Sequence, residues 1–269
     1  MRVASRPRSF VRVAGPDAED YLNRMVSNDV AVLGPGEACE ALLLTPKARL
    51  IAPLVVLRRS HDDYLLLTEP DLGERVRAEL VRGRFAAKTD IGVEEHTSHV
   101  VFGAKSEIDS GIPTAAYGEP AAEVLDADLE PTVSAEELES LRIRAGTPAW
   151  GKELDDRVLP AEAGLDERAI SFTKGCYPGQ EPIARLHYRG HANRGLRLLE
   201  LAELPEPETE VIYQGKSVGR VTSAAAGSDG VVALAYVRRE VPPDAELEVG
   251  HGSASQRRRL ATLAAPERP

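Results

Sequence analysis

The stretch Lys174-Gly175-Cys176-Tyr177-Pro178-Gly179-Gln180-Glu181 places a thiol between a cation and a carboxylate, with glycine and proline where a tight turn needs them. This crowding of reactive and turn-forming residues is a poor way to build a hydrophobic core. The cation of Lys174 favours the thiolate of Cys176 if the two side chains meet. A buried cysteine can also act as a small apolar residue, as we expect for Cys39 in its apolar run. The stretch therefore predicts a functional thiol at Cys176, with an inert thiol as the alternative.

Cations gather around this stretch, although the chain as a whole is acidic, with a formal net charge of -10. Between positions 174 and 197 the one acid is Glu181, and the cations are Lys174, Arg185, Arg189, Arg194 and Arg197. Such a basic island favours a small anionic ligand, a phosphate or a carboxylate. The alternative is a cationic surface that is paired with acids from elsewhere in the fold. The net charge argues against binding of nucleic acid through the whole surface, and we expect no nucleic-acid partner.

The length and composition of the chain are those of a globular protein with about two domains. It has 269 residues, of which 42% are apolar, enough for sizeable cores. No apolar run approaches the ~20 residues that cross a bilayer, and no apolar segment of the signal-peptide kind follows the basic N-terminus. The two cysteines, Cys39 and Cys176, do not require an oxidising compartment. We therefore expect a cytoplasmic protein without a membrane partner.

Residues 1–190 alternate strand and helix patterns, which predicts an α+β region. Apolar runs predict strands at 9–13, 38–45, 50–57, 63–68 and 100–103. A helix is expected after Pro16, because the apolar residues that follow it recur at helical spacing. A second helix is expected at 71–81, and Ser134 with Glu137 forms the capping box of a third that ends near Gly146.

The last eighty or so residues look different, because short strand patterns alternate there with turns. The predicted strands lie at 196–201, 211–213, 218–223 and 231–237. Prolines at 205, 207, 242 and 243 exclude long helices, so a small antiparallel β-barrel is expected. The segment 106–131 is rich in proline, glycine and acids, and is expected to be an irregular connection with weak strands.

Other reactive groups give weaker signals. His187 and His191 stand four apart, but Gly190 argues against one helix through both, and no third zinc ligand is close in sequence. The glycine motifs of dinucleotide and P-loop sites and the G-x-S-x-G elbow are absent. Two cysteines are too few for one chain to hold a four-thiolate iron–sulfur cluster. A nucleophilic pair of Cys176 with either histidine stays open, and no metal ligand is predicted.

The opening stretch resembles the K-G-C-[YF]-x-G-Q-E signature of the YgfZ proteins, folate-binding relatives of the glycine-cleavage T-protein. Similar segments along nearly the whole chain are 13–18 (VAGPDA), 27–30 (SNDV), 141–151 (LRIRAGTPAWG), 159–165 (LPAEAGL) and 219–223 (GRVTS). The resemblance implies two related α+β subdomains within 1–190, at about 1–90 and 91–190, and a C-terminal β-barrel at 191–269. It also implies tetrahydrofolate in a central opening.

The resemblance further implies a function in the assembly or repair of iron–sulfur clusters, with the signature cysteine needed and no settled catalysed reaction. The implied partners are folate and iron–sulfur proteins or their assembly factors. Cys176 and Lys174 are the implied functional pair. The implied folate-binding residues are Gly175, Tyr177, Gly179, Gln180, Glu181, Arg185, Tyr188 and Glu162. Gln180 and Glu181 would orient the loop or a pterin-like ring, and Arg185 would meet a carboxylate.

The chain departs from the T-protein enzymes at their catalytic aspartate. Their G-G-x-x-D-D-L segment corresponds to 47–54, where Ala52 and Pro53 stand in place of the paired acids. Neither side chain accepts a proton, which argues against glycine cleavage, and Pro53 is expected to interrupt its strand at an edge or a bulge. One alternative function is a folate-dependent aminomethyl or one-carbon transferase that uses Asp29 or Glu162 as its acid. Another is a thiol-dependent hydrolase or redox protein that uses Cys176 alone.

Overall fold

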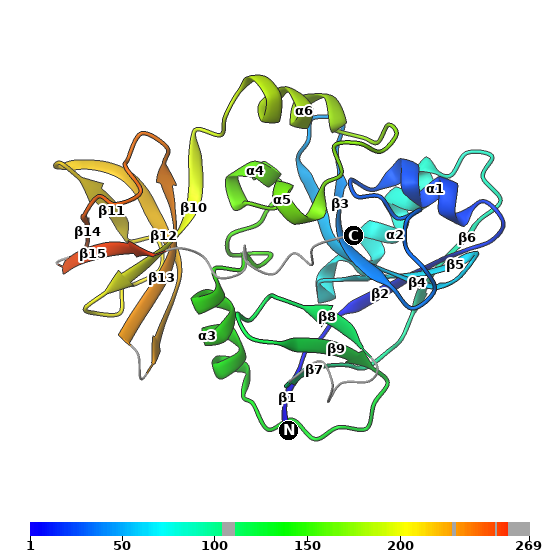
Figure 1. Cartoon of the computed structure of the whole chain (residues 1–269), viewed down its shortest axis with the longest axis horizontal. Helices are drawn as coiled ribbons and strands as arrows, with labels where there is room; N and C mark the ends of the chain where they lie inside the picture. The colour runs from blue at the N-terminus through cyan, green and yellow to red at the C-terminus, as the bar shows by residue number, and fades with distance from the viewer. Residues whose placement is uncertain (104–110, 228–229, 251, 258–269) are drawn as a thin grey trace.

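Two antiparallel sheets and a closed β-barrel make up the protein, with helices packed against them (Figure 1). The structure is a computed structural model that describes residues 1–103, 111–227, 230–250 and 252–257. Its architecture is the α+β region followed by an antiparallel barrel that the sequence predicts. Within the described part of the chain, no helix is long and apolar enough to span a membrane.

The first sheet has five antiparallel strands in the order β3-β4-β5-β2-β6. Its strands are β2 (Ser9–Ala14), β3 (Ala38–Leu44), β4 (Leu50–Ser60), β5 (Asp63–Thr68) and β6 (Asp90–Glu94). Apolar residues dominate the inner strands, as the sequence predicts. The edge strand β6 was not expected, because it is short and mostly half-buried or exposed.

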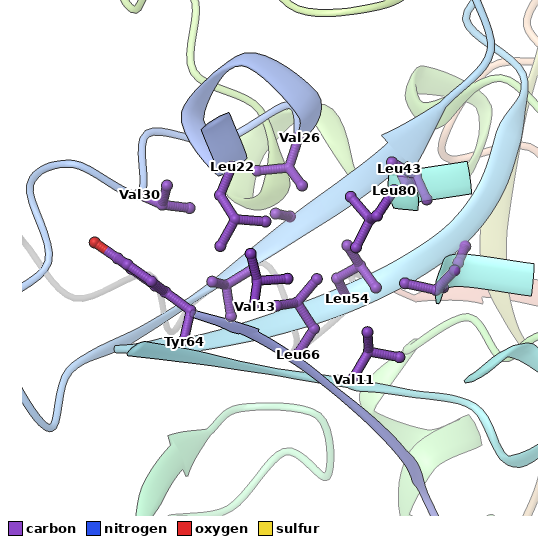
Figure 2. Close-up of a cluster of buried hydrophobic side chains, with 14 of the residues drawn as sticks. Val11, Val13, Leu22, Val26, Val30, Leu43, Leu54, Tyr64, Leu66 and Leu80 are labelled. Atoms are coloured by element: carbon purple, nitrogen blue, oxygen red, sulfur yellow. The ribbon is translucent and has the colours of Figure 1, made fainter. Parts of the chain in front are cut away.

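Helices cover one face of this sheet and bury the core against it. They are α1 (Ala18–Met25), the short 3-10 helix η1 (Pro70–Leu72) and α2 (Gly73–Gly83). Figure 2 shows Leu22 of α1 and Leu80 of α2 in one cluster with Val13, Leu54 and Leu66 of the strands. The helical spacing of apolar residues places them on a single face of each helix. Complete burial of each such leucine contributes about 1.5–3 kcal/mol.

The second sheet has four antiparallel strands in the order β1-β7-β9-β8. Its strands are β1 (Arg2–Ser5), β7 (Ser98–Phe102), β8 (Ile112–Thr114) and β9 (Ala121–Leu125). The short strands β8 and β9 lie in the expected weak segment, of which 106–110 is outside the described residues. Strand β1 joins the second sheet and β6 joins the first, so the sheets exchange strands across the expected boundary near residue 90. That boundary stays a prediction.

Helix α3 (Ala135–Ala145) begins and ends where the sequence predicts. The Oγ atom of Ser134 accepts a hydrogen bond from the backbone N–H of Glu137 (3.1 Å) and caps the helix. Gly146 adopts the left-handed conformation, with φ of 77°, that closes the helix C-terminus.

A closed barrel forms the C-terminal part, in the order β10-β13-β12-β11-β14-β15. Its strands are β10 (Arg194–Leu201), β11 (Glu210–Tyr213), β12 (Lys216–Gly227), β13 (Gly230–Arg238), β14 (Leu247–Val249) and β15 (Gly252–Arg257). Leu199, Val221 and Val237 belong to its buried apolar interior. The predicted hairpin turn is present, because Gln214 and Gly215 have φ of 51° and 71° between β11 and β12.

Short helices connect the second sheet to the barrel. They are α4 (Pro160–Ala163), α5 (Asp166–Ala169) and α6 (Gln180–Arg189). In Figure 1, α6 lies at the edge of the molecule above α4 and α5, and β10 leads from it into the barrel. Helix α6 ends at Arg189, so His187 and His191 do not share a helix, as Gly190 indicated.

Pro53 does not interrupt its strand, contrary to the sequence-based expectation. Strand β4 continues through it as an inner strand, with Pro53 opposite Leu42 of β3. The expectation of an edge strand is therefore wrong. The bulge lies at Ile51, because Ala52 pairs with Leu43 while Leu50 pairs with Leu44.

The position of Pro53 explains why an inner strand tolerates it. Its carbonyl oxygen points toward β5 and accepts a hydrogen bond from the hydroxyl of Thr68 (2.8 Å). The nitrogen of a strand residue faces the same neighbour as its carbonyl group. Because the pairing of β4 with β5 begins only at Val55, the missing N–H of Pro53 removes no bond from this ladder.

Candidate functional site

The predicted thiol lies on the segment 171–179 that joins α5 to α6, hereafter the Cys176 loop. Its beginning is tied to the segment that follows α1, because the backbone N–H of Ser171 donates to the carbonyl oxygen of Ser27 (3.0 Å). The ammonium of Lys174 donates to the carbonyl oxygens of Val26 (2.9 Å) and Asn28 (2.6 Å). These bonds fix the loop to a segment that is distant in sequence, since Lys174 and Val26 are 148 residues apart.

The side chains of Ser27 and Asn28 hold that segment in place. The Oγ atom of Ser27 donates to the carbonyl oxygen of Ala169 (2.6 Å). The amide of Asn28 donates to the carbonyl oxygens of Glu40 (2.7 Å) and Arg168 (3.2 Å). Both side chains are buried, so each bond satisfies a polar group that would otherwise be desolvated without a partner. Through these bonds, Ser27 and Asn28 link β3 to α5, next to the start of the Cys176 loop.

Lys174 has an altered acidity in this position. Burial lowers the pKa of its ammonium from 10.5 to about 8, although electrostatic interaction with Asp29 and Cys39 opposes the shift. Its Nζ atom also lies 5.5 Å from the ring centroid of Tyr177. The contacts of Lys174 are therefore with backbone oxygens and an aromatic ring, whereas the sequence suggested the thiol of Cys176. Activation of that thiol by Lys174 stays a prediction.

Cys176 and Tyr177 are neighbours in different surroundings. The thiol of Cys176 is exposed, whereas Tyr177 is 7% exposed. The Tyr177 hydroxyl is buried and has no hydrogen-bond partner among the described residues, and burial raises its pKa to about 12. A buried hydroxyl without a partner costs about 1–3 kcal/mol. This group is consequently an unsatisfied donor within the described part of the fold.

The two predicted loop glycines have different roles. Gly179 has φ of 84°, and a Cβ atom added there would lie 2.7 Å from the carbonyl oxygen of Thr45 and 3.0 Å from Cα of Ala48. Both the backbone conformation and the close approach exclude a side chain. A Cβ atom added at Gly175 would meet nothing within 4 Å, so the space beside the loop is open there.

The basic island is largely bound within the fold. Besides Lys174, the guanidinium of Arg197 donates to carbonyl oxygens of the barrel, including that of Val241 (2.8 Å). Arg194 forms an ion pair with Glu162, with 3.1 Å between Nε and Oε1. The alternative of a cationic face paired with acids from elsewhere therefore holds for Arg194, whereas Lys174 and Arg197 donate to backbone carbonyl oxygens.

Arg185 and Arg189 are different, because both are exposed on α6. Among the described residues, no hydrogen bond or ion pair involves either guanidinium. Gln180 and Glu181 form the first turn of the same helix, and Glu181 is exposed. The unpaired positive charge that can meet an anion is thus on the exposed side of α6.

The candidate acids of the alternative function carry structural bonds. Besides its pair with Arg194, Glu162 accepts a hydrogen bond from the backbone N–H of Leu159 (3.1 Å), and its side chain is 12% exposed. Asp29 accepts a bond from the backbone N–H of Ala31 (3.2 Å). Their roles as folate ligand or catalytic acid stay predictions.

An aromatic cluster fastens the Cys176 loop to α6. Phe172 of the loop stacks on His187 of the helix, with ring centroids 3.9 Å apart. Tyr188 meets the edges of both rings, and its side chain is 68% exposed.

His187 is therefore engaged in stacking, and the described residues contain no group of three or more potential ligands arranged for a metal ion. Phe172 was not predicted as a site residue, because its contact with His187 depends on helix α6, which was not predicted either.

The strand position of the T-protein acids is apolar. Ala52 is completely buried and belongs to the core cluster beneath α1 and α2. A carboxylate at this point would lose its hydration without a partner.

A cavity of about 480 Å³ lies elsewhere, between α1 and the end of α2. Its polar groups already have partners within the fold. The hydroxyl of Tyr21 donates to the carbonyl oxygen of Leu80, and Arg24 pairs with Asp20 at 2.9 Å. The carboxylate of Asp17 accepts a bond from the backbone N–H of Lys88 (2.7 Å). The Cys176 loop, with its unsatisfied hydroxyl and exposed thiol, is therefore the stronger candidate site.

No family model matches the chain, but individual proteins do. An uncharacterised protein of Haemophilus influenzae is 27% identical over 239 residues, which are 85% of either chain. The tRNA-modifying protein YgfZ of Cronobacter sakazakii is 25% identical over 263 residues, which cover 82% of this chain and 79% of that protein. The crystal structure of the glycine cleavage system aminomethyltransferase T from Bartonella henselae matches with a TM-score of 0.84 and 19% identity, covering 94% of this chain and 84% of that one. The last likeness shows that the fold is shared.

Proposed function

We propose, on the premise that this chain belongs with the YgfZ proteins and their aminomethyltransferase relatives, that it binds a reduced folate beside the Cys176 loop. The observation that carries the proposal is the loop itself. It presents an exposed thiol at Cys176 on a backbone that Lys174 and Gly179 hold in one conformation. A fixed loop with a reactive group at its surface is the usual construction of a binding site.

The residues at this loop suit a folate. The Tyr177 hydroxyl is a buried donor without a partner among the described residues, which suits the acceptor atoms of a pterin ring. The open space beside Gly175 admits a ring close to the backbone. The unpaired guanidinium of Arg185 suits a carboxylate of the glutamate tail. A bound tetrahydrofolate would supply a carrier for one-carbon groups, while Gln180, Glu181 and Tyr188 would orient it.

We further propose that Cys176 serves the assembly or repair of iron–sulfur clusters, as part of a cytoplasmic accessory protein and not a classical enzyme. Thiolates are the preferred ligands of iron in such clusters. Cys176 offers one exposed thiol, whereas Cys39 is buried. The remaining ligands would therefore come from an iron–sulfur protein or an assembly factor bound to this chain.

Titration of the purified protein with tetrahydrofolate tests the first proposal. We expect saturable heat in calorimetry and a change in the fluorescence of Trp150, which packs against two of the core clusters. The Cys176→Ala variant should bind with the same affinity, because the thiol is not needed to hold the ligand. A titration without saturable binding would remove the folate proposal.

The thiol proposal is tested in a deletion strain that is complemented with variants of this chain. Cys176→Ala should fold normally and fail to restore the activity of iron–sulfur enzymes, because the one exposed cysteine among the described residues is lost. Thr173→Ala, at an exposed position of the same loop, is the control and should restore it. Full rescue by Cys176→Ala would contradict the role of the thiol.

The second candidate is a folate-dependent aminomethyl or one-carbon transferase, favoured by the shared fold of aminomethyltransferase T. It is weaker because Ala52 and Pro53 offer no carboxylate, and a substitute such as Asp29 would have to act. Incubation with tetrahydrofolate and an aminomethyl donor distinguishes the candidates. Methylene-tetrahydrofolate formed well above the uncatalysed rate, and lost in Asp29→Asn, would favour the transferase.

A further inference from the structure

The turn after α2 carries a large apolar side chain that the fold leaves in solvent. Phe85 is 94% exposed, more than any other large apolar residue that the structure describes. Its backbone φ of 45° lies in the left-handed region, which is unfavourable for a bulky side chain. Strained residues of this kind concentrate where a protein meets a ligand or a partner. Because neither the exposure nor the strain stabilises the fold, we expect Phe85 to act in a contact with another molecule.

Hydrogen bonds hold this turn in one conformation. The backbone N–H of Ala87 donates to the carbonyl oxygen of Arg84 (2.9 Å) and closes the turn around Phe85. The Nη1 atom of Arg84 donates to the carbonyl oxygen of Thr89 (3.2 Å), which ties the start of the turn to the segment that follows it. An aromatic ring on a preformed turn binds a partner at a lower entropic cost than a ring on a mobile segment.

Phe85 lies at the cavity of about 480 Å³ between α1 and the end of α2. Met25 of α1 packs on Gly83 of α2, since a Cβ atom added at Gly83 would lie 2.6 Å from the Cε atom of Met25. Ala86 and Ala87 line the same cavity. Its volume is in the range of binding pockets, and its polar groups already have partners in the fold, so these apolar groups are what it offers. The cavity therefore suits a large apolar side chain of a bound molecule.

Positive charge predominates next to the cavity. Between positions 75 and 88 the one acid is Glu79, and the cations are Arg75, Arg77, Arg82, Arg84 and Lys88. Among the described residues, the guanidinium of Arg84 has no ion pair, and the ammonium of Lys88 has neither an ion pair nor a hydrogen bond. The acids beside the cavity have partners, since Asp20 pairs with Arg24 (2.9 Å) and Asp17 accepts a backbone hydrogen bond (2.7 Å). The charge that remains to meet a partner is therefore positive.

We infer that Phe85, the cavity beside it and the cations Arg84 and Lys88, hereafter the Phe85 surface, bind an acidic segment of a partner protein that inserts one large apolar side chain into the cavity. The inference goes beyond the proposed function, because none of these residues belongs to the Cys176 loop or to α6. The Phe85 surface adjoins α1, on the side of the molecule away from the barrel (Figure 1).

The charges of the chain favour this occupant over a second copy of the protein. The formal net charge is -10, so an acidic partner is repelled by most of the surface and attracted where cations predominate. A second copy placed across a two-fold axis would bring the same cations, Arg84 and Lys88, face to face. Like charges in that arrangement oppose association.

Fluorescence anisotropy with a synthetic peptide tests the inference. The probe is a fluorescein-labelled peptide in which glutamates flank a central Leu-Phe pair, and a matched peptide carries lysines in place of the glutamates. We expect the acidic peptide to bind saturably, with a Kd below about 1 mM, and the basic peptide to show no saturable binding. Binding of the acidic peptide should weaken as the salt concentration rises, because its ion pairs at the rim of the cavity are exposed.

Substitutions separate the contribution of the aromatic ring from that of the charge. Phe85→Asn should weaken binding of the acidic peptide by about tenfold or more, as expected for the loss of an anchor residue. Asparagine adopts the left-handed backbone more readily, so the midpoint of urea denaturation should stay unchanged or rise. Lys88→Gln should weaken binding by up to about fivefold. Leu204→Asn and Arg239→Gln, at exposed positions of the C-terminal part, are the matched controls and should leave binding unchanged.

The inference is overturned if the acidic peptide fails to bind, if the basic peptide binds equally well, or if Phe85→Asn binds as the unaltered protein does. A lower midpoint of urea denaturation in Phe85→Asn would show that the ring serves the fold itself. Dimers in sedimentation that Phe85→Asn dissociates would assign the surface to a second copy, and co-sedimentation with phosphatidylserine vesicles that Phe85→Asn abolishes would assign it to a membrane. Each of these results would also overturn the inference.

Discussion

Gly179 sets the course of the Cys176 loop at the scale of one residue. Its left-handed backbone, with φ of 84°, turns the chain from the loop into α6. At the same point the chain passes so close to the turn after β3 that a Cβ atom would lie 2.7 Å from the carbonyl oxygen of Thr45. Glycine is therefore required here by conformation and by space together.

Substitution of this glycine should be costly, and a second glycine of the same loop provides the control. Gly179→Ala forces a side chain into a left-handed, crowded position, and we expect it to lower the free energy of unfolding by about 1–3 kcal/mol. Gly175→Ala should change it by less than about 0.5 kcal/mol, because no atom lies within 4 Å of the added Cβ. Urea denaturation of both variants measures the difference, and equal effects would contradict the proposed role of Gly179.

Single residues of the site were predictable by type but not by partner. The sequence predicted Cys176, Tyr177 and Gly179 as site residues because reactive and turn-forming residues are crowded there, and their role in a site stays a prediction. It could not show that the ammonium of Lys174 meets the carbonyl oxygens of Val26 and Asn28, since backbone oxygens carry no sequence signal. The altered acidity of this amine follows from that burial alone.

At the scale of elements, His96 links the two sheets. Its Nε2 atom is 2.9 Å from a carboxylate oxygen of Glu94, at the end of β6 in the first sheet. Its Nδ1 atom is 2.6 Å from a carboxylate oxygen of Asp126, directly after β9 in the second sheet. Burial lowers the pKa of His96, but the hydrogen bonds to both carboxylates outweigh it and raise the pKa above its ordinary value of 6.5.

The stability of this link should depend on pH. Because the folded-state pKa is raised, the contribution of His96 is fully present below the unfolded value of 6.5 and is lost as pH rises through the folded value. We expect His96→Gln to lower the free energy of unfolding by about 1 kcal/mol near pH 5.5 and by less near pH 8.5. The comparison is made by urea denaturation at both pH values.

An exposed histidine serves as the control for this measurement. His61→Gln removes a histidine at an exposed position and should change the free energy of unfolding by less than about 0.5 kcal/mol. A loss of stability in His96→Gln that is the same at both pH values would contradict the ionic role of His96.

The elements differed in how well the sequence predicted them. The inner strands and helices α1, α2 and α3 follow apolar periodicity or caps, which are local signals. Helix α6 was not predicted from the sequence. Ile183 is its buried residue, so the helix shows no stripe of apolar residues that would indicate it. Pro182 in its first turn is compatible with a helix, but no helix was predicted for this stretch. The partners of α6 and of β6 come from distant segments, which the local pattern does not report.

At the scale of the whole molecule, a buried polar network joins α3 to the barrel. Arg142 of α3 pairs with Glu153 at 2.9 Å, and its guanidinium also donates to the hydroxyl of Ser223 in β12 (3.1 Å). The same hydroxyl donates to the other carboxylate oxygen of Glu153 (2.5 Å). The side chain of Glu153 is completely buried, so its charge depends on these partners.

Removal of one partner of this network should destabilise the entire chain. We expect Glu153→Ala to lower the free energy of unfolding by about 1–3 kcal/mol, because it removes a completely buried partner of Arg142 and Ser223, while Arg142 keeps its ion pair with Glu139 at 2.6 Å. Glu208→Ala breaks an ion pair with Arg220 in which both side chains are more than half exposed, 63% and 56%. That control should cost about 1 kcal/mol or less. Equal shifts in thermal unfolding for the two variants would show that the network does not hold the barrel in place.

The sequence by itself determined the α+β class, the barrel and the caps of α3, since these depend on periodicity and turn residues, and it predicted a site around Cys176 from local chemistry. The tertiary structure alone decided which charges of the basic island stay unpaired. Arg194 and Arg197 are bound by Glu162 and by barrel carbonyls, whereas Arg185 and Arg189 remain exposed without partners among the described residues. The reason is physical: the pairing of a charge depends on groups brought close from distant positions, and distance along the chain does not reveal distance in space.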